Sequence, residues 1–316
     1  MDLFWSIVLA AGGVVLVLYF SEQLVKGVVG TSMHFSVSAF LISVIFLGFD
    51  PENLGVGAVG SYEEFAGIAS GSIIGAAMVA MALALGVTAL IVPLKFKKIS
   101  KKILIVPFLS VVLFALLALD RQLSRWDGII LLAGYALAIV YLIYLNRQGI
   151  SIKSGGEVAE MLQKEKLPAK WKSAGLMTLS LAAIIVGSEM LVRASETILK
   201  SINISGTLYG MTIIAFVVSI EEIARELPAA LKGKPDISMG NVVGSVLAFF
   251  LFNAGVIALV SPVQLSAQTV DFFLPVSLAT ILFIVLMLLF VSRIPRWAGA
   301  VLVLFYVAFV LGGYLI

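Results

Sequence analysis

The sequence predicts an all-α polytopic membrane protein with ten transmembrane helices, arranged as two inverted five-helix repeats. The first observation is composition, since 61% of the 316 residues are hydrophobic and 12% are charged, whereas soluble domains are about 25% charged. The second is a series of apolar segments that are each long enough to cross a bilayer, which takes roughly 20 residues. The third is a set of short sequences that recur half a chain later.

The apolar segments are separated by short connections, except for one long polar stretch in the middle of the chain. The segments cover residues 3–29, 38–62, 66–94, 103–119, 127–146, 174–199, 206–231, 237–261, 269–292 and 297–316. We therefore expect a first transmembrane repeat at 1–146, a cytoplasmic linker at 147–173 and a second transmembrane repeat at 174–316. The first segment carries Asp2 and no basic residue before its apolar run, so we interpret it as a mature helix rather than a signal peptide.

Lysine and arginine are distributed unevenly between the two sides of these segments. Short cytoplasmic loops carry the excess of both residues. Placing the N-terminus outside puts most of them in cytoplasmic loops and leaves only Arg121, Arg125 and Lys200 outside. We expect an integral protein of the plasma membrane of a prokaryote, with both termini outside.

Two pairs of similar sequences support the repeat. SEQLVK at 21–26 resembles SEMLVR at 188–193, and IASGSIIG at 68–75 resembles ISMGNVVG at 237–244. Because five helices is an odd number, the second copy must enter the membrane from the opposite side. Inverted repeats place substrate and coupling-ion sites near the midplane, at the interface of the repeats.

Acidic and amide residues interrupt the apolar segments at two places. They are Asp50, Glu52 and Asn53 in the first repeat, and Glu221, Glu222 and Glu226 in the second. A charged residue at the centre of a membrane helix costs roughly 2.5–3.5 kcal/mol, so such residues usually line a path for a substrate or an ion. Glu222 and Glu226 are four residues apart and are expected to share a helix face. The alternative is a purely structural network with Arg225 or Arg193.

Other acidic residues of the membrane segments have a simpler interpretation. Glu22 and Lys26, like Glu189 and Arg193, have the i,i+4 spacing of helical ion pairs. We expect both pairs to support packing or gating rather than to bind an ion.

Glycine and serine are concentrated at 67–78 and 236–247, where the next segment begins in each repeat. Glycine-rich helices at bilayer depth can expose carbonyl oxygens, which together with carboxylates replace the hydration shell of a hard cation. One carboxylate from each half also matches the charge of a divalent cation. Four side chains are further candidate ligands, although small polar residues also serve close helix packing. They are Ser72, Ser219, Asn241 and Ser245.

These motifs resemble the calcium/cation antiporter superfamily, which includes sodium/calcium and proton/calcium exchangers, and the similarity extends over essentially the whole chain. A typical family repeat has G-T-S-x-P-E, followed by G-N-x-x-G-S at the start of the next helix. GNVVGS at 240–245 matches the second motif, and counting back places Glu222 at the cation-binding glutamate of the family. In the first repeat that position falls on Glu52 or Asn53. Glu52 is favoured because it follows Pro51 and is a carboxylate.

The sequence also departs from the family pattern. Val217 and Val218 replace Gly and Thr, Phe49 lies near the corresponding place in the first repeat, and Phe249 stands where many members have an acid or an amide. Most of the hydroxyl groups that line sodium sites in the family are therefore missing. This weakens the expectation of three-sodium coupling and leaves proton coupling, another stoichiometry or Mg²⁺ as alternatives.

The sequence thus predicts a secondary antiporter that exchanges a divalent cation for Na⁺ or H⁺ by alternating access. Ca²⁺ is the first expectation and Mg²⁺ the second, with Glu52 and Glu222 binding the cation and Asp50 and Glu221 assisting. A gradient-independent cation channel is the alternative. An enzyme is not expected, because the sequence contains no HExxH, nucleophile elbow or phosphate-binding loop.

The remaining expectations concern cofactors and partners. No cofactor is expected, and the absence of cysteine excludes disulfides and thiolate metal sites. The expected partners are inorganic cations and the lipid bilayer, and the expected oligomeric state is a monomer. The net charge of +3 is too small to suggest nucleic acid.

Overall fold

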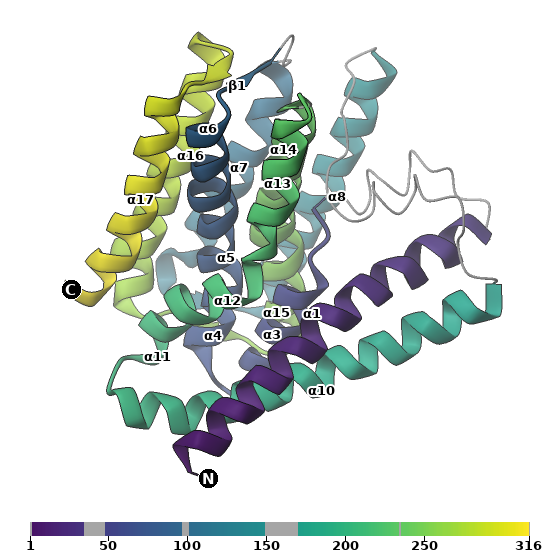
Figure 1. The fold of residues 1–316 in the computed structure, drawn as a ribbon, viewed down its shortest axis with the longest axis vertical. Helices are drawn as coiled ribbons and strands as arrows, with labels where there is room; N and C mark the ends of the chain where they lie inside the picture. The colour runs from purple at the N-terminus through teal and green to yellow at the C-terminus, as the bar shows by residue number, and fades with distance from the viewer. Residues whose placement is uncertain (1, 35–47, 97–100, 149–169, 234, 316) are drawn as a thin grey trace.

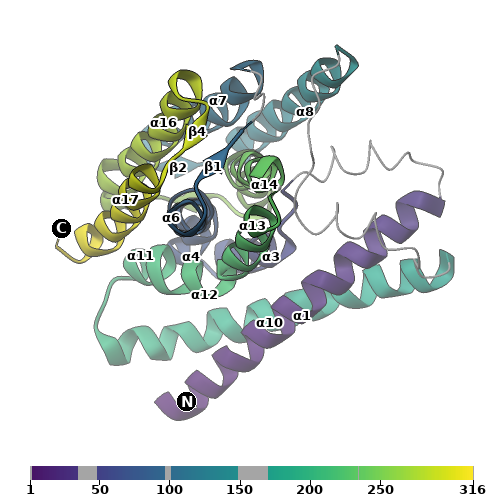
Figure 2. The same cartoon turned by 45° about the horizontal axis from the view of Figure 1, so that its top comes forward.

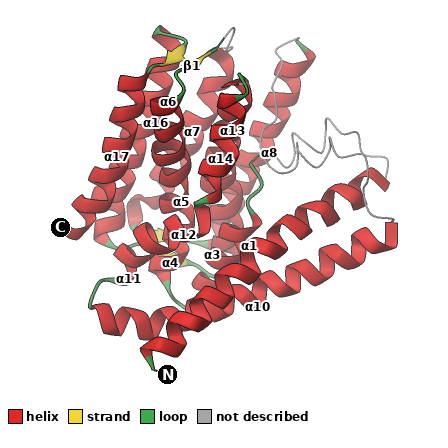
Figure 3. Cartoon of the chain, viewed as in Figure 1, coloured by secondary structure: helices red, strands yellow, loops and turns green. Residues whose placement is uncertain are grey.

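The computed structural model describes residues 2–34, 48–96, 101–148, 170–233 and 235–315, and these residues are almost entirely helical (Figure 3). Nine helices in this described part are long and apolar enough to cross a membrane. They are Leu3–Met33, Ala66–Ile91, Lys101–Asp120, Arg125–Arg147, Trp171–Ile202, Gly206–Leu231, Ser238–Val260, Thr269–Phe290 and Arg296–Leu315. The remaining expected segment, 38–62, is described only from residue 48, and most of the expected linker at 147–173 lies outside the described residues.

The elements follow one another in a similar order in the two halves. The first half contains α1 (Leu3–His34), α3 (Pro51–Tyr62), α4 (Ala66–Ser70), η1 (Gly71–Gly75), α5 (Ala76–Met78), η2 (Val79–Ala84), α6 (Leu85–Ile91), β1 (Leu94–Lys95), α7 (Lys101–Leu117), η3 (Ala118–Asp120), β2 (Gln122–Leu123) and α8 (Arg125–Arg147). The second half contains α10 (Lys170–Ile202), α11 (Gly206–Leu208), η4 (Tyr209–Ile214), α12 (Ala215–Ser219), α13 (Glu221–Leu231), α14 (Pro235–Leu247), η5 (Ala248–Asn253), α15 (Ala254–Val260), β3 (Val263–Gln264), η6 (Thr269–Phe273), α16 (Leu274–Phe290), β4 (Arg293–Ile294) and α17 (Arg296–Leu315).

The two longest helices, α1 and α10, lie side by side and run at a steep angle to the other helices (Figures 1 and 2). They have 32 and 33 residues, more than a perpendicular span needs, and a long apolar helix fits a bilayer by tilting. Gly13 and Gly187 allow their backbones to approach closely, since a β-carbon at Gly13 would crowd the carbonyl oxygen of Gly187.

The expected ion pairs of these two helices are confirmed. Lys26 Nζ lies 2.8 Å from Glu22 Oε1, and Arg193 Nη2 lies 2.6 Å from Glu189 Oε1. All four side chains are partly exposed, so the pairs stabilise helix surfaces rather than the interior.

The expectation of one continuous helix over 38–62 is wrong in the part that is described. Gly48 has a left-handed backbone (φ 69°), and a β-carbon there would collide with the backbone of Gly244. The helix begins only at Pro51, which lacks an N–H and suits the first turn. Asp50 caps it, and its carboxylate accepts a hydrogen bond from the backbone N–H of Asn53.

The segment expected at 206–231 is also interrupted. It divides at Ile220, between the end of α12 at Ser219 and the start of α13 at Glu221. The start of α3 and the break at Ile220 therefore lie directly beside the acidic residues, where backbone groups leave the regular helical hydrogen-bonding pattern.

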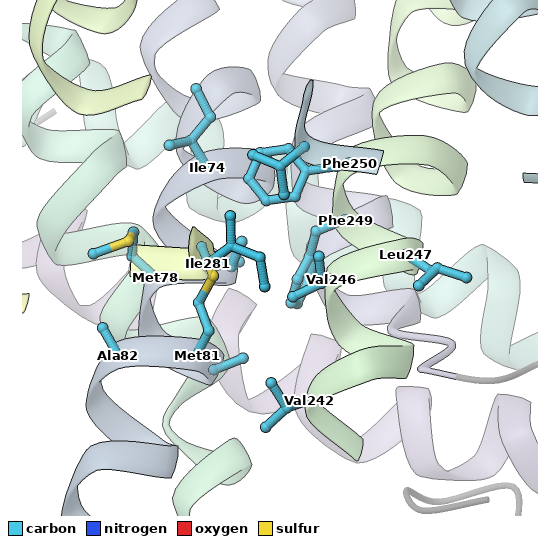
Figure 4. Packing of buried hydrophobic residues seen from close by; sticks show 14 of the residues in the cluster. Ile74, Met78, Met81, Ala82, Val242, Val246, Leu247, Phe249, Phe250 and Ile281 are labelled. Carbon is cyan, nitrogen blue, oxygen red and sulfur yellow. The ribbon is translucent and has the colours of Figure 1, made fainter. Parts of the chain in front are cut away.

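The centre of the molecule is formed by the spans Ala66–Ile91 and Ser238–Val260, in each of which 83% of the most apolar window is buried. Figure 4 shows Met81 from the first of these spans and Val242 and Val246 from the second among the buried apolar side chains of one cluster. Tight apolar packing of this kind makes the two central spans a rigid scaffold for the polar residues that they carry.

Two short antiparallel strand pairs join the halves. Strand β1 pairs with β4, with Leu94 opposite Ile294, and β2 pairs with β3, with Leu123 opposite Val263. Each pair contains one strand from each half, so connecting segments of the first half are hydrogen-bonded to connecting segments of the second.

Helix packing between the halves follows the same reciprocal scheme. α6 packs against α17 where Gly86 meets Gly299, and α15 packs against α8 where Gly255 meets Gly128. A β-carbon at Gly299 would lie 2.7 Å from the carbonyl oxygen of Gly86, and one at Gly128 would lie 2.8 Å from that of Gly255. Only glycine permits these helix crossings without a backbone shift.

Candidate cation site

The first polar group of the interior is built around the capping residue Asp50, whose side chain is 2% exposed. Its Oδ1 accepts a hydrogen bond of 2.8 Å from the backbone N–H of Asn53, and its two carboxylate oxygens lie 3.2 and 3.1 Å from the side-chain Nδ2 of Asn53. The amide of Asn253 in η5 donates to the carbonyl oxygen of Asp50 at 3.5 Å. Short side chains therefore hold a buried carboxylate at the start of α3.

Asn53 connects this group to the second half of the chain. Its Nδ2 also donates a 2.8 Å hydrogen bond to Ser219 Oγ, at the end of α12. Both side chains are fully buried. The structure therefore brings together Asp50, Asn53 and Ser219, which the sequence analysis had proposed from two separate motifs.

The second polar group surrounds Glu222, which is 1% exposed on α13. Asn241 Nδ2 donates to Glu222 Oε2 at 2.7 Å, and Ser245 Oγ donates to Oε1 at 3.2 Å. Asn241 and Ser245 are four residues apart and lie on one face of α14. Hydrogen bonds to a charged acceptor are stronger than neutral ones, so this arrangement positions both carboxylate oxygens.

The buried side-chain oxygens that have no hydrogen-bond partner among the described residues include three amide and hydroxyl oxygens of interest here: Asn53 Oδ1, Ser72 Oγ and Asn253 Oδ1. Buried polar atoms are nearly always paired, so each exception needs an explanation. Ser72 lies in η1 and Asn253 in η5, both π-helical turns, and such turns frequently occur at functional sites. Oxygens of this kind are suitable ligands for a hard cation.

Sequence reasoning missed Asn253. It stands alone in the apolar run AFFLFNAGV at 248–256, and an isolated amide in such a run was the available signal. Its buried contact with Asp50 became evident only from the fold.

The remaining acidic candidates occupy different environments. Glu52 on α3 and Glu226 on α13 are fully buried, whereas Glu221 is only half-buried. The shared face of Glu222 and Glu226 is confirmed by the burial of both side chains. Both carboxyl oxygens of Glu226 are without a hydrogen-bond partner among the described residues.

The side chain of Arg225 lies outside the described residues, so the expected network of Arg225 is not described. Phe249, at the position where the related family carries a polar residue, is fully buried in the apolar core (Figure 4).

The site is rich in mixed oxygen donors. No group of three or more His, Asp or Glu residues that could hold a metal ion occurs in the described part of the chain. The available donors are single carboxylates together with amide and hydroxyl oxygens, a set that suits a hard cation such as Ca²⁺ rather than a transition metal.

Comparisons with known proteins extend over nearly the whole chain. A family model described as sodium/calcium exchanger protein matches residues 5–144 and 172–314. An uncharacterized membrane protein of Methanocaldococcus jannaschii is 29% identical over 298 residues, which is 93% of each chain. A sodium/calcium exchanger of Methanosarcina acetivorans is 26% identical over 335 residues, covering 94% of this chain and 95% of that one.

The fold gives the same result. A solved structure of the sodium-calcium exchanger NCX_Mj superposes with a TM-score of 0.60 at 25% identity, covering 97% of this chain and 98% of that one. The family match includes both polar groups of the interior, the one around Asp50 and the one around Glu222. The chain therefore belongs to the sodium/calcium exchanger protein family and is a membrane transporter rather than an enzyme.

Proposed function

We propose that this protein is a secondary antiporter that exchanges a divalent cation, Ca²⁺ before Mg²⁺, for Na⁺ or H⁺ by alternating access. The observation that carries the proposal is the hydrogen bond from Asn53 to Ser219. It joins the polar group at the start of α3 to the segment that leads to Glu222. Buried carboxylates from both halves, with oxygen donors between them, supply the charge and the coordination that a divalent cation requires.

Within this proposal the carboxylates of Glu52 and Glu222 bind the cation, and the other polar residues complete or support the site. These residues are Asp50, Asn53, Glu221, Glu226, Ser219, Ser72, Asn241 and Ser245. Asn241 and Ser245 orient the Glu222 carboxylate through their hydrogen bonds. The partnerless oxygens of Asn53 and Ser72 are direct ligand candidates.

The inverted arrangement of two five-helix repeats is part of the same proposal. It is supported by the reciprocal pairing of β1 with β4 and of β2 with β3. It is also supported by two glycine crossings that couple the third apolar span of each half to the last helix of the other. η2 and η5 are both six-residue π-helical segments and occupy the same place in the two halves. Two inverted copies generate a site that can open toward either side.

Alternating access requires an element that moves against the scaffold. We assign this role to α1 and α10, which pack mainly on each other and cross the central spans at an angle (Figure 1). Sliding of this pair across the core would expose the site to one side of the membrane and then to the other.

The coupling ion can be identified by flux measurements on the purified protein in liposomes. We would add Ca²⁺ outside and impose either an outward Na⁺ gradient or an outward proton gradient, with the membrane voltage clamped, and repeat both with Mg²⁺. Acceleration of Ca²⁺ uptake by the Na⁺ gradient identifies Na⁺ as the counter-ion, and acceleration by the proton gradient alone identifies H⁺. Ca²⁺ uptake that is independent of both gradients and depends only on membrane voltage contradicts the antiporter proposal and supports a channel.

A further inference from the structure

An apolar groove lies between α7 and α8, away from the candidate cation site. Its cavity volume is about 390 Å³, within the range of roughly 300–1,000 Å³ that small-ligand sites occupy. Its walls are mainly Ile105, Leu109, Leu137, Ala138 and Tyr141, and Leu251 of η5 also contributes. Ile105, Leu109 and Leu137 are exposed and lie on predicted membrane spans, so the groove opens toward the bilayer.

The groove exists because small residues line α8 where the corresponding helix carries large ones. α8 and α17 both begin with Arg-Trp directly after a paired strand. Aligning these starts places Gly134 and Ala138 of α8 opposite Phe305 and Phe309 of α17. Gly134 and Ala138 line the groove.

In the second half, aromatic rings occupy the corresponding space. Phe305 packs against Phe283 with ring centroids 5.9 Å apart, and Phe309 packs against Phe273 at 4.7 Å. The same helix arrangement is therefore filled by protein in one half and left open to the membrane in the other.

Basic residues gather at one end of the groove. Lys101 and Lys102 begin α7, Arg147 ends α8, and all three are exposed. The two helices are consecutive and antiparallel, so these residues lie at the same end of the molecule, the upper end in Figure 1. Neither α7 nor the second half of α8 contains an acidic residue. Tyr141, with an apolar ring and a polar hydroxyl, lies on the α8 wall of the groove.

We propose that this groove binds one acyl chain of an anionic phospholipid, whose phosphate group lies at Lys101, Lys102 and Arg147. An apolar channel open to the bilayer selects a hydrocarbon chain, and three basic side chains on helix segments that carry no acidic residue of their own select a negative headgroup. The proposal does not depend on the cation that the protein transports.

The acyl-chain part of the proposal is tested by filling the groove with a phenylalanine ring, as phenylalanine rings fill the corresponding space in the second half. We would measure phosphatidylglycerol retained by the detergent-purified protein in native mass spectrometry, comparing Ala138→Phe with Ala136→Phe. Ala136 is exposed on the same helix and does not line the groove. Ala138→Phe should lower the affinity for phosphatidylglycerol about tenfold, because each methylene of the acyl chain that the ring displaces loses a favourable contact. Ala136→Phe should leave this affinity unchanged. Equal retention in both variants overturns the proposal.

The headgroup part uses exposed positions, where substitution does not disturb the core. Lys101→Gln and Lys102→Gln should each reduce binding of phosphatidylglycerol roughly fivefold without affecting phosphatidylcholine of the same chain length. Lys232→Gln, at the exposed end of α13, is the matched control and should change the binding of neither phosphatidylglycerol nor phosphatidylcholine. An unchanged preference for phosphatidylglycerol in both lysine variants contradicts the proposal. A dimer of the wild-type protein that Ala138→Phe dissociates would also contradict it, because a second copy of the chain would then occupy the groove.

Discussion

At the residue scale, the polar interior uses short amide and hydroxyl side chains to hold longer acidic ones. Asn53 and Asn241 each direct an amide N–H group at a buried carboxylate, Asp50 in the first case and Glu222 in the second. An ionised carboxylate buried without such donors would be very costly. The amides therefore make the acidic residues compatible with bilayer depth, and the side-chain oxygen of Asn53 has no hydrogen-bond partner among the described residues.

Replacing Glu222 with Gln should lower the affinity for the transported cation roughly 100-fold, because the charge of the ligand set governs affinity for hard cations. Glutamine preserves the shape of the side chain, so folding should be retained. Isothermal titration with Ca²⁺ and liposome flux measure the change, and Glu52→Gln should behave in the same way. Glu189→Gln removes only a partly exposed ion pair and serves as the control. If exchange by Glu222→Gln and Glu52→Gln equals that of the wild type, the ligand assignment fails.

The hydrogen bond between Asn53 and Ser219 can be isolated by a double-mutant cycle. Asn53→Ala also removes a donor from Asp50 and should cost about 1–3 kcal/mol of unfolding free energy. The coupling between Asn53→Ala and Ser219→Ala should be near 0.6 kcal/mol, with an upper value of about 1.7 kcal/mol, as for other hydrogen bonds between membrane helices. Reversible unfolding in mixed micelles gives all four free energies. Strictly additive effects would show that the bond contributes nothing to stability.

At the scale of the elements, the candidate site residues lie in or beside segments that depart from regular helices. Gly48 precedes the helix that begins at Pro51, Ile220 separates α12 from α13, and π-helical segments occur in both central spans and in the span that carries Glu222. Irregular backbone at membrane depth is tolerated where it is buried in protein or lines a polar cavity. Close backbone contacts at glycines stabilise these irregular segments against each other.

The contact between η4 and the start of the first central span should be intolerant of any side chain. A β-carbon at Gly210 would collide with the carbonyl oxygen of Gly67, whereas one at Gly206 meets nothing within 4 Å. We expect Gly210→Ala to destabilise the protein by about 1–3 kcal/mol through overpacking, and Gly206→Ala to have little effect. Thermal unfolding in detergent compares the two. Equal melting temperatures would contradict the close approach of these segments.

At the scale of the whole molecule, paired strands connect the two halves at each end of the helix bundle. The strand pairs β1–β4 and β2–β3 each combine a connection from one half with a connection from the other. With the reciprocal glycine crossings, this produces one continuous scaffold around the central spans. In the proposed alternating access, such a scaffold would hold the halves together while α1 and α10 move as a pair.

The inverted arrangement predicts that corresponding strands face opposite sides of the membrane. The natural chain contains no cysteine, so single cysteines can be introduced directly, and Lys95 in β1 and Gln264 in β3 are both exposed. In right-side-out vesicles, a membrane-impermeant maleimide should label Gln264→Cys and not Lys95→Cys. Labelling of both positions would contradict the inversion, and the reverse pattern would contradict only the orientation with both termini outside.

The amino-acid sequence by itself determined the membrane class, the approximate spans, the family resemblance, Glu222 as a candidate ligand and the surface pairs Glu22–Lys26 and Glu189–Arg193. These depend on composition, on local periodicity and on spacing along one helix. The left-handed backbone at Gly48, the bond from Asn53 to Ser219, the contact of Asn253 with Asp50 and the groove beside Ala138 were decided only by the tertiary structure. Each depends on which side chains from distant segments meet, and the pattern along a single helix identifies a buried face without identifying the residues packed against it.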